Sequence, residues 1–250
     1  MIAASLTAAL ALLSSASEQP PVPQERPYSA VSSGPVRSGP INDQTRLLSD
    51  SDAALFRQGL TAARARDVIG ARNAAAQIGD PVARKLVEWA LLDTSAEQLP
   101  WSDLSVAQSS FSGWPRGDGR RVAAERALDL ANAGPDAALG FFGEGSPVSV
   151  QGAIALASAL EQSGRGDEAR RLITEWWRTR SFDDAFQNRI LTRWGGWLTQ
   201  DDHDARLGVL LLGPHGPATR AMVQRASPGR RAVAEAVMAL RTAYSPDAIV

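Results

Sequence analysis

Apolar residues recur at helical spacing along most of the chain, and the pattern is clearest between residues 146 and 178. Two successive stripes with intervals of three or four residues occur there: Val150, Ile154, Ala157 and Leu160, then Ala169, Leu172, Ile173 and Trp176. Such stripes predict amphipathic helices. Ser146 is a suitable N-cap, and Pro147 suits the first helical position. Because Gly164 lies between the two stripes and can end the first helix, we expect an antiparallel helix hairpin.

Similar patterns continue from residue 46 to residue 250. Further helices are expected from about Ser51, over 67–78, from Pro81, over 102–110, 118–132, 134–142, 182–194 and 199–212, after Pro217, and from Ser227. Two of these stripes are expected to face inward: Val82, Leu86, Trp89 and Ala90, and then Val233, Ala236, Val237 and Leu240. No stretch alternates polar and β-branched residues, so no sheet is expected. The pattern predicts an all-α fold, a superhelical array of antiparallel helix hairpins. This α-solenoid would be tetratricopeptide-like without the strict consensus.

The first 17 residues have a different composition. They contain no charged residue, and an apolar run from Leu6 to Leu13 ends in small residues. Ser14 and Ala16 fit the small-residue positions before a signal-peptidase cleavage site. We therefore expect a signal peptide over 1–17 and a periplasmic location. A buried helix is the alternative, because no Lys or Arg precedes the apolar run.

Residues 18–45 read as a linker before the helical domain, 46–250. This segment is rich in Pro, Ser and Gly and has few large apolar side chains. Such a composition buries too little surface to offset its ordering entropy. A spacer is expected here, with a Pro-rich ligand for a partner domain as the alternative.

Charge and cysteine content exclude several classes of function. The net charge is −1, so no bulk field favours nucleic acid, and Lys85 is the one lysine among 26 basic residues. The chain has no cysteine, which excludes thiolate catalysis, cysteine-ligated zinc and disulfides. No window holds 18 apolar residues in a row, so no stable membrane insertion is expected.

The densest polar cluster is Thr199-Gln-Asp-Asp-His-Asp204. Its acids and His203 could be metal ligands. Neighbouring positions on a helix point about 100° apart, however, so four consecutive side chains cannot converge on one ion. A helix start explains the cluster better, with Thr199 as N-cap and Asp202 in a capping box. We therefore predict no metal site, no cofactor and no catalytic residue here.

The tryptophans and arginines are the other candidates for binding. Sugar rings stack on indole, but Trp89, Trp176 and Trp194 lie on apolar stripes and are expected in the core. Trp101 and Trp114 stand beside prolines and resemble plugs at helix boundaries, which leaves Trp177 and Trp197 as candidates for exposed surface. Three arginine groups are expected on solvated helix faces, with contact to an anionic polymer as the alternative: Arg116, Arg120 and Arg121; Arg165, Arg170 and Arg171; Arg230 and Arg231.

Three segments have distinctive helix boundaries: FSGWPRGDGRRVAAERAL (111–128), FFGEGSPVSVQGAIALASALEQSGRGDEARRLITEWWRTRSF (141–182) and WLTQDDHDARLGVLLLG (197–213). Their features are a Trp-Pro turn before an Ala-Glu-rich helix, a Ser-Pro-x-Ser-x-x-Gly helix start, and an Asp-His-x-x-Arg-Leu helix. In these features the segments resemble the helical domain of periplasmic soluble lytic murein transglycosylases. The resemblance extends over 51–250 and implies a superhelical domain that precedes a lysozyme-like domain acting on peptidoglycan.

The catalytic pattern of that family is missing from this sequence. Members use a glutamate in a Glu-Ser motif, followed by a Gly-Leu-Met-Gln stretch. None of the ten glutamates here is followed by serine, and Gly-Leu-Met-Gln does not occur. The resemblance therefore implies no catalytic residue in this chain.

Three functional expectations follow. The first is a periplasmic helical scaffold that positions peptidoglycan glycan strands or a catalytic domain. The second is a helical-repeat adaptor of the cell envelope with a protein partner. A complete enzyme of unknown type is the third and would need a cleft of converging acids or histidines.

Overall fold

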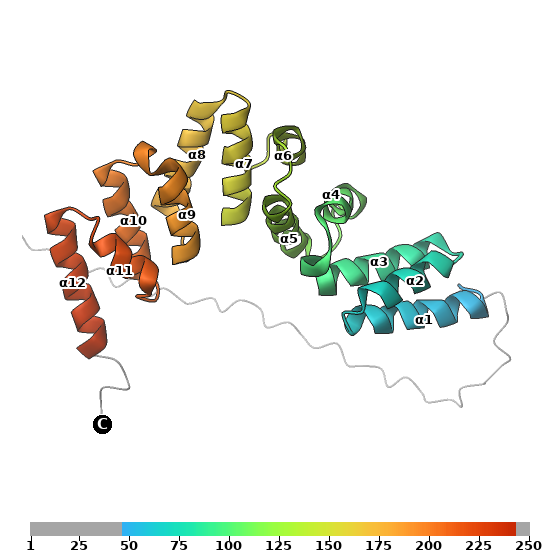
Figure 1. Cartoon of the computed structure of the whole chain (residues 1–250). Helices are drawn as coiled ribbons and strands as arrows, with labels where there is room; N and C mark the ends of the chain where they lie inside the picture. The colour runs from blue at the N-terminus through green and yellow to red at the C-terminus, as the bar shows by residue number, and fades with distance from the viewer. Residues whose placement is uncertain (1–46, 244–250) are drawn as a thin grey trace, which may run out of the picture. The chain divides into compact units, whose positions relative to one another are not determined.

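The computed structural model describes residues 47–243 and shows an all-α fold (Figure 1). The α-helices are α1 (Asp50–Arg64), α2 (Val68–Gln77), α3 (Pro81–Ser95), α4 (Trp101–Ser110), α5 (Gly117–Leu130), α6 (Pro135–Phe142), α7 (Val150–Gln162), α8 (Gly166–Thr179), α9 (Asp184–Trp194), α10 (Gln200–Leu212), α11 (Pro217–Val223) and α12 (Pro228–Ala243). Short 3₁₀ turns follow α3 (η2, Ala96–Gln98) and α9 (η3, Gly195–Trp197). No strand occurs in 47–243, so the predicted fold class is confirmed for that span. The expected signal peptide and linker lie outside the described residues.

Side-chain caps explain where many helices begin. The oxygen of an N-cap side chain accepts a backbone N–H that the first turn leaves unpaired. Asp67 caps α2 in this way, Asp80 caps α3 before Pro81, and Thr199 caps α10. All three starts agree with the sequence prediction.

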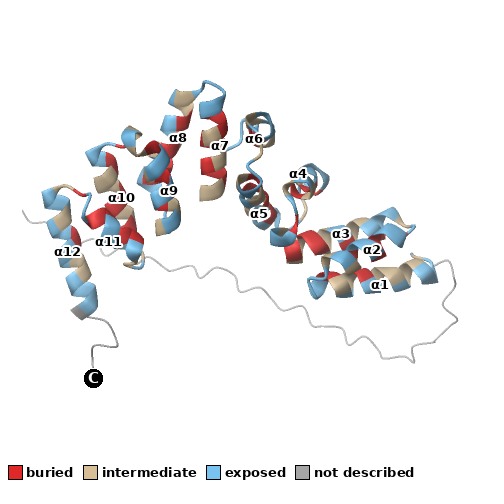
Figure 2. Cartoon of the chain, in the orientation of Figure 1, coloured by how far each residue is buried: buried red, intermediate tan, exposed pale blue. Residues whose placement is uncertain are grey.

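Helices pack chiefly against the helices one or two places away in the chain. Four clusters of buried apolar residues result, lying successively among α1–α3, α3–α5, α5–α7 and α7–α12. Figure 2 shows the buried residues on the sides of the helices that face their neighbours. This succession is compatible with the expected array of hairpins, while a regular superhelix stays a prediction. No helix in 47–243 combines the length and the apolar character that a membrane crossing requires.

The start of α7 corrects the sequence prediction. The cap is Ser149, not Ser146, and Pro147 precedes the helix. The reason is the wholly buried carboxylate of Glu125 on α5, which accepts the backbone N–H groups of Val148 and Ser149 at 2.8–3.1 Å. The Ser149 hydroxyl also donates to Glu125 at 2.6 Å. These bonds hold the backbone before α7 outside the helix, and no pattern within 146–150 encodes them.

Two predicted inward stripes were also wrong in part. On α3, Val82 is 64% exposed, and the buried face instead carries Ala83, Val87, Leu91 and Leu92. On α12, Val233 and Leu240 are 51% and 59% exposed, whereas Ala234 is wholly buried. Alanines let helix axes approach closely, so a face with a small residue can pack better than one with large side chains. Periodicity alone does not distinguish two adjacent stripes on one helix.

Gly152 tests the junction between α5 and α7. A Cβ at Gly152 would lie 2.2 Å from Glu125 Oε2, whereas a Cβ at Gly119, the third residue of α5, meets no atom within 4 Å. We predict that Gly152→Ala lowers the free energy of unfolding by about 1–3 kcal/mol, because the buried carboxylate has to move. Gly119→Ala occupies the matching helical position and is expected to change stability by less than about 1 kcal/mol, in the favourable direction. Urea unfolding followed by circular dichroism measures both, and equal stabilities would contradict the packing described.

Candidate functional site

Asp202 and Asp204, two of the acids at the start of α10, form hydrogen bonds at helix ends. Thr199 and Asp202 form the predicted capping box, and Arg178 donates to Asp202 at 2.8 Å. Asp204 accepts instead from the backbone and hydroxyl of Ser227, which precedes α12. Burial raises the pKa of Asp202, but the hydrogen bonds from Thr199 and Arg178 outweigh it, so this pKa lies below its usual value. The two carboxylates therefore serve separate structural partners.

His203 lies at the edge of the packed face, as its spacing from Leu207 predicts. Its ring meets Trp177 edge-on with 5.8 Å between centroids, and its Nδ1 is buried without a hydrogen-bond partner in the described part of the chain. Burial, followed by the charge of Arg225, lowers the pKa of His203, against smaller opposing effects of Asp202 and Asp204. The neutral imidazole is therefore favoured in the folded protein.

The lowered pKa of His203 predicts an acid-sensitive stability. An unfolded histidine titrates near pH 6.5, so lowering the pH through that value adds protons to the unfolded state first and weakens folding. We expect the free energy of unfolding to fall between pH 8 and pH 5.5. The fall should be smaller in His203→Gln, while the control His215→Gln should retain it. Chemical denaturation at a series of pH values measures this, and parallel profiles for wild type and His203→Gln would contradict the assignment.

Two arginines, Arg120 and Arg206, are internal hydrogen-bond donors. Arg120 is 4% exposed and donates to the carbonyls of Phe111, Trp114 and Pro115, which corrects its predicted solvated position. Arg206 on α10 is wholly buried, and burial lowers its pKa to about 10. Both hold loop backbone in place and are unavailable to a ligand.

Arg206 is held by the loop between α8 and α9 and by Gln187 on α9. Its guanidinium donates to the carbonyl oxygens of Arg180 and Phe182 and to Gln187 Oε1. It also lies over the Phe182 ring, 3.7 Å from the centroid. No carboxylate pairs with Arg206 among the described residues, which explains why burial alone controls its pKa. Arg206 is the arginine of the Asp-His-x-x-Arg-Leu segment, and it therefore holds the loop between α8 and α9 in place.

The structure contradicts the predicted exposure of one tryptophan. Trp176 and Trp194 are buried as expected, and Trp89 is half-buried. Trp177 is 0% exposed, so its expected place on the surface was wrong, because the α8 helix buries two neighbouring faces between α7, α9 and α10. Trp197 alone of the two surface candidates remains accessible, half-buried in η3.

Trp197 lines a shallow pocket of about 410 Å³ together with Gly164, Gly166, Asp167 and Arg170, which we call the Trp197 pocket. Its glycines and charged residues come from the turn between α7 and α8 and from the first turns of α8. Asp167 and Arg170 are exposed, and Arg170 donates to the Trp197 carbonyl at 3.4 Å.

The indole of Trp197 is supported from beneath. It stacks on Trp194 with 5.9 Å between ring centroids and 25° between planes. Trp194 is itself fixed, because its Nε1 donates to Glu161 and Arg193 lies over its ring. An aromatic platform beside a carboxylate, a guanidinium and uncovered glycine backbone can stack on an apolar ring face and hydrogen-bond its polar edge.

No family model, curated protein or solved structure matches this chain. Within 47–243, no group of three His, Cys, Asp or Glu side chains is placed to hold a metal ion.

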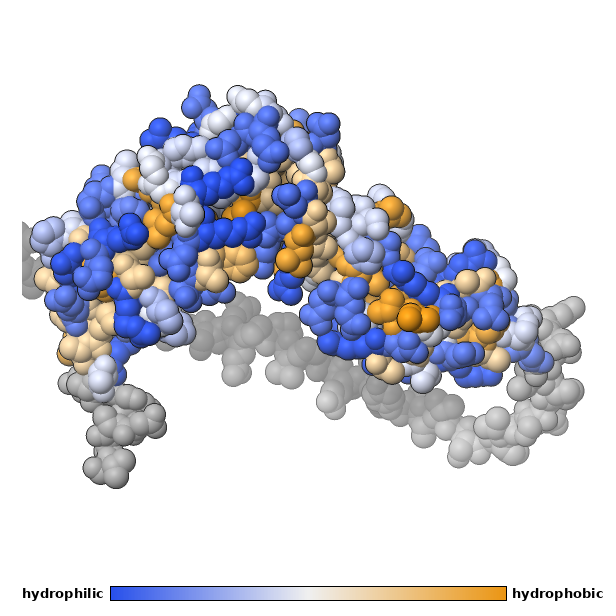
Figure 3. Space-filling model, in the orientation of Figure 1, coloured by the Kyte–Doolittle hydropathy of each residue, from blue (hydrophilic) through white to orange (hydrophobic). Residues whose placement is uncertain are grey.

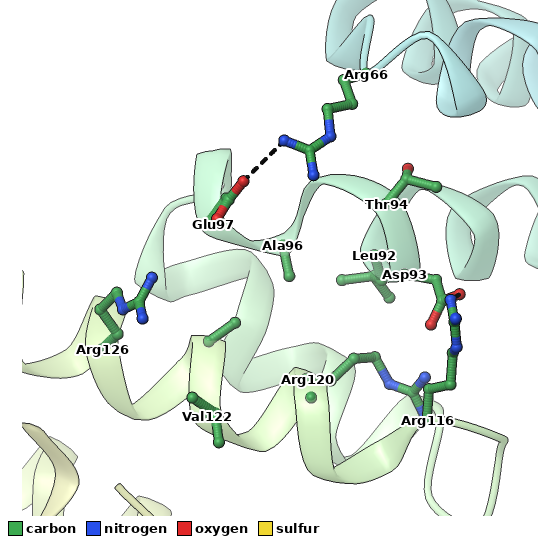
Figure 4. Close-up of a pocket in the computed structure, with 12 residues that line it drawn as sticks. Arg66, Leu92, Asp93, Thr94, Ala96, Glu97, Arg116, Arg120, Val122 and Arg126 are labelled. Atoms are coloured by element: carbon green, nitrogen blue, oxygen red, sulfur yellow. Dashed lines mark hydrogen bonds and ion pairs between the residues drawn. The ribbon is translucent and has the colours of Figure 1, made fainter. Parts of the chain in front are cut away.

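The face drawn in Figure 3 is mainly hydrophilic, and its apolar residues form separate patches. Large apolar side chains that stay exposed include Leu130 at 79% and Leu212 at 84%. A further cavity, between η2 and α5, is lined by arginines (Figure 4).

Proposed function

We propose that this chain is a helical scaffold of the periplasm that binds peptidoglycan glycan strands through the Trp197 pocket. The three segments that resemble lytic murein transglycosylases support the cell-wall assignment. The single observation that carries it is the supported indole of Trp197 beside Asp167 and Arg170.

The chemistry of the pocket suits an N-acetylated sugar. The C–H face of a pyranose ring packs on an indole, and the stacked Trp194 keeps that indole from turning away. Asp167 can accept from sugar hydroxyls, while Arg170 can donate to a hydroxyl or an acetamido carbonyl. A shallow, half-open pocket binds one unit of a long polymer without enclosing it, and affinity grows when several units engage.

The proposed role is binding without cleavage. Cleavage of a glycosidic bond needs a carboxylic acid placed at the leaving oxygen. Three of the described glutamates are engaged elsewhere: Glu125 accepts backbone N–H groups before α7, Glu161 pairs with Arg193, and Glu168 pairs with Arg165. Asp167 is the one carboxylate of the Trp197 pocket. A catalytic domain outside residues 47–243 would complete a cleaving enzyme.

A pull-down with purified sacculi tests this proposal. We expect wild type to sediment with sacculi, and Asp167→Asn combined with Arg170→Gln to lose at least about tenfold in affinity, since two polar contacts are removed. Arg171→Gln is the matched control, because Arg171 is exposed on the same helix and outside the pocket. Binding no better than that of albumin, or equal loss in the control, would contradict glycan binding.

A protein adaptor is the second candidate, and one observation favours it. Val233 and Leu240 are exposed two turns apart on α12, where a helix of a partner could pack. A photo-crosslinker at position 240 would then yield a single protein adduct, which Val233→Glu abolishes. That result together with no binding to sacculi would favour the adaptor.

A further inference from the structure

The arginine cavity is a second candidate binding site, formed on elements other than those of the Trp197 pocket. It has a volume of about 460 Å³ and lies between α3, η2 and α5, with Arg66 reaching in from the turn after α1 (Figure 4). Its charged lining residues are four arginines and two acids: Arg66, Arg116, Arg120 and Arg126, against Asp93 and Glu97. The cavity therefore carries an excess of positive charge.

The arginines differ in how far they are already engaged. Arg66 pairs with Glu97 at 3.0 Å, and Arg116 pairs with Asp93 at 2.6 Å. Arg120 is committed to backbone carbonyls, as described above. Arg126 is exposed and forms no hydrogen bond or ion pair with any other residue of the described span. Its donors are free to bind an anion.

The backbone at two of these arginines is unusual. Arg66 and Arg116 have φ values of 58° and 60°, in the left-handed region that side chains other than those of Gly and Asn rarely adopt. Each such residue costs about 1 kcal/mol or more. Only one other non-glycine residue in 47–243 has a positive φ, Asn132, whose residue type tolerates it. Two strained arginines thus place their guanidinium groups at the same cavity, a pattern that accompanies binding sites.

An apolar pocket of about 260 Å³ adjoins the arginine cavity. The two share four lining residues: Ala96, Glu97, Ala123 and Arg126. The remainder of the second pocket is apolar, formed by Leu99, Pro100, Trp101, Ala127, Leu130 and Ala131. Figure 4 shows Arg66 and Arg126 on opposite sides of Glu97, which lines both pockets. An anion held by Arg126 would therefore have an apolar surface beside it.

We propose that the arginine cavity binds a carboxylate that carries an adjacent aliphatic group, as the C-terminal residue of a peptide does. Arg126 donates to the carboxylate as a bidentate fork, and Arg66 stays oriented by its pair with Glu97. The aliphatic side chain lies against Trp101 and Leu130 in the apolar pocket. A monoanion suits the site better than a dianionic phosphate, because Asp93 and Glu97 also line it. The proposal does not depend on glycan binding.

The test uses small probes that isolate each part of the ligand. Binding of N-acetyl-L-leucine is followed by ¹H–¹⁵N chemical-shift titration of the full chain at low salt. We expect N-acetyl-L-leucine amide, which lacks the charge, and acetate, which lacks the aliphatic group, each to bind at least about tenfold more weakly. Inorganic phosphate at pH 7.5 is expected to bind more weakly as well. Phosphate binding as tight as that of N-acetyl-L-leucine would overturn the proposal.

Matched variants locate the site. Arg126→Gln is expected to weaken N-acetyl-L-leucine binding at least about tenfold, and Leu130→Ser to reduce the preference for it over acetate. Arg64→Gln removes the same charge from an exposed position on the last turn of α1, outside the cavity, and should leave affinity within about twofold. Both Arg126 and Leu130 are exposed, so the fold should persist, and unchanged circular dichroism checks this. Equal loss in Arg64→Gln and Arg126→Gln would show bulk charge instead of a site.

Discussion

Buried charged side chains that hydrogen-bond to loop backbone are the interaction on which the rest of this structure depends. Short loops between closely packed helices leave N–H and C=O groups away from water, and each must find a partner. Three side chains supply them: Arg120 binds carbonyls before α5, Glu125 binds amides before α7, and Arg206 binds carbonyls between α8 and α9. Removing any one of these side chains would leave buried backbone groups unpaired, which costs more than the hydrogen bonds contribute.

These anchors also account for particular residues of the segments 111–128 and 141–182. Glu125 belongs to one such segment, and the Ser149 and Gly152 it contacts belong to another. Gly152 leaves room for the carboxylate, because any Cβ there would collide with it. Serine, glycine and glutamate at these positions are therefore explained by packing. Their presence therefore carries no information about catalysis.

The surface sites arise where helices end and loops begin. The Trp197 pocket takes its residues from the turn before α8, the first turns of α8 and η3, and the arginine cavity takes Arg66 and Arg116 from loop positions. Each site has a rigid support. In the Trp197 pocket it is the stacked Trp194, and in the arginine cavity it is the ion pair of Arg66 with Glu97. Other side chains of each site keep hydrogen-bonding groups free. Such sites suit reversible binding of extended ligands, because one face stays open to solvent.

The helices, their approximate bounds and several caps follow from the sequence, because local spacing and capping residues determine them within one or two turns. The capping box of Thr199 and Asp202, the burial of Trp194 and the all-α class could be predicted in this way. The burial of Trp177, the start of α7 at Ser149 and the convergence of Arg66 with Arg126 could not. Each depends on which face of a helix meets residues distant in the chain. Only the tertiary structure decides that, since adjacent stripes on one helix have almost the same periodicity.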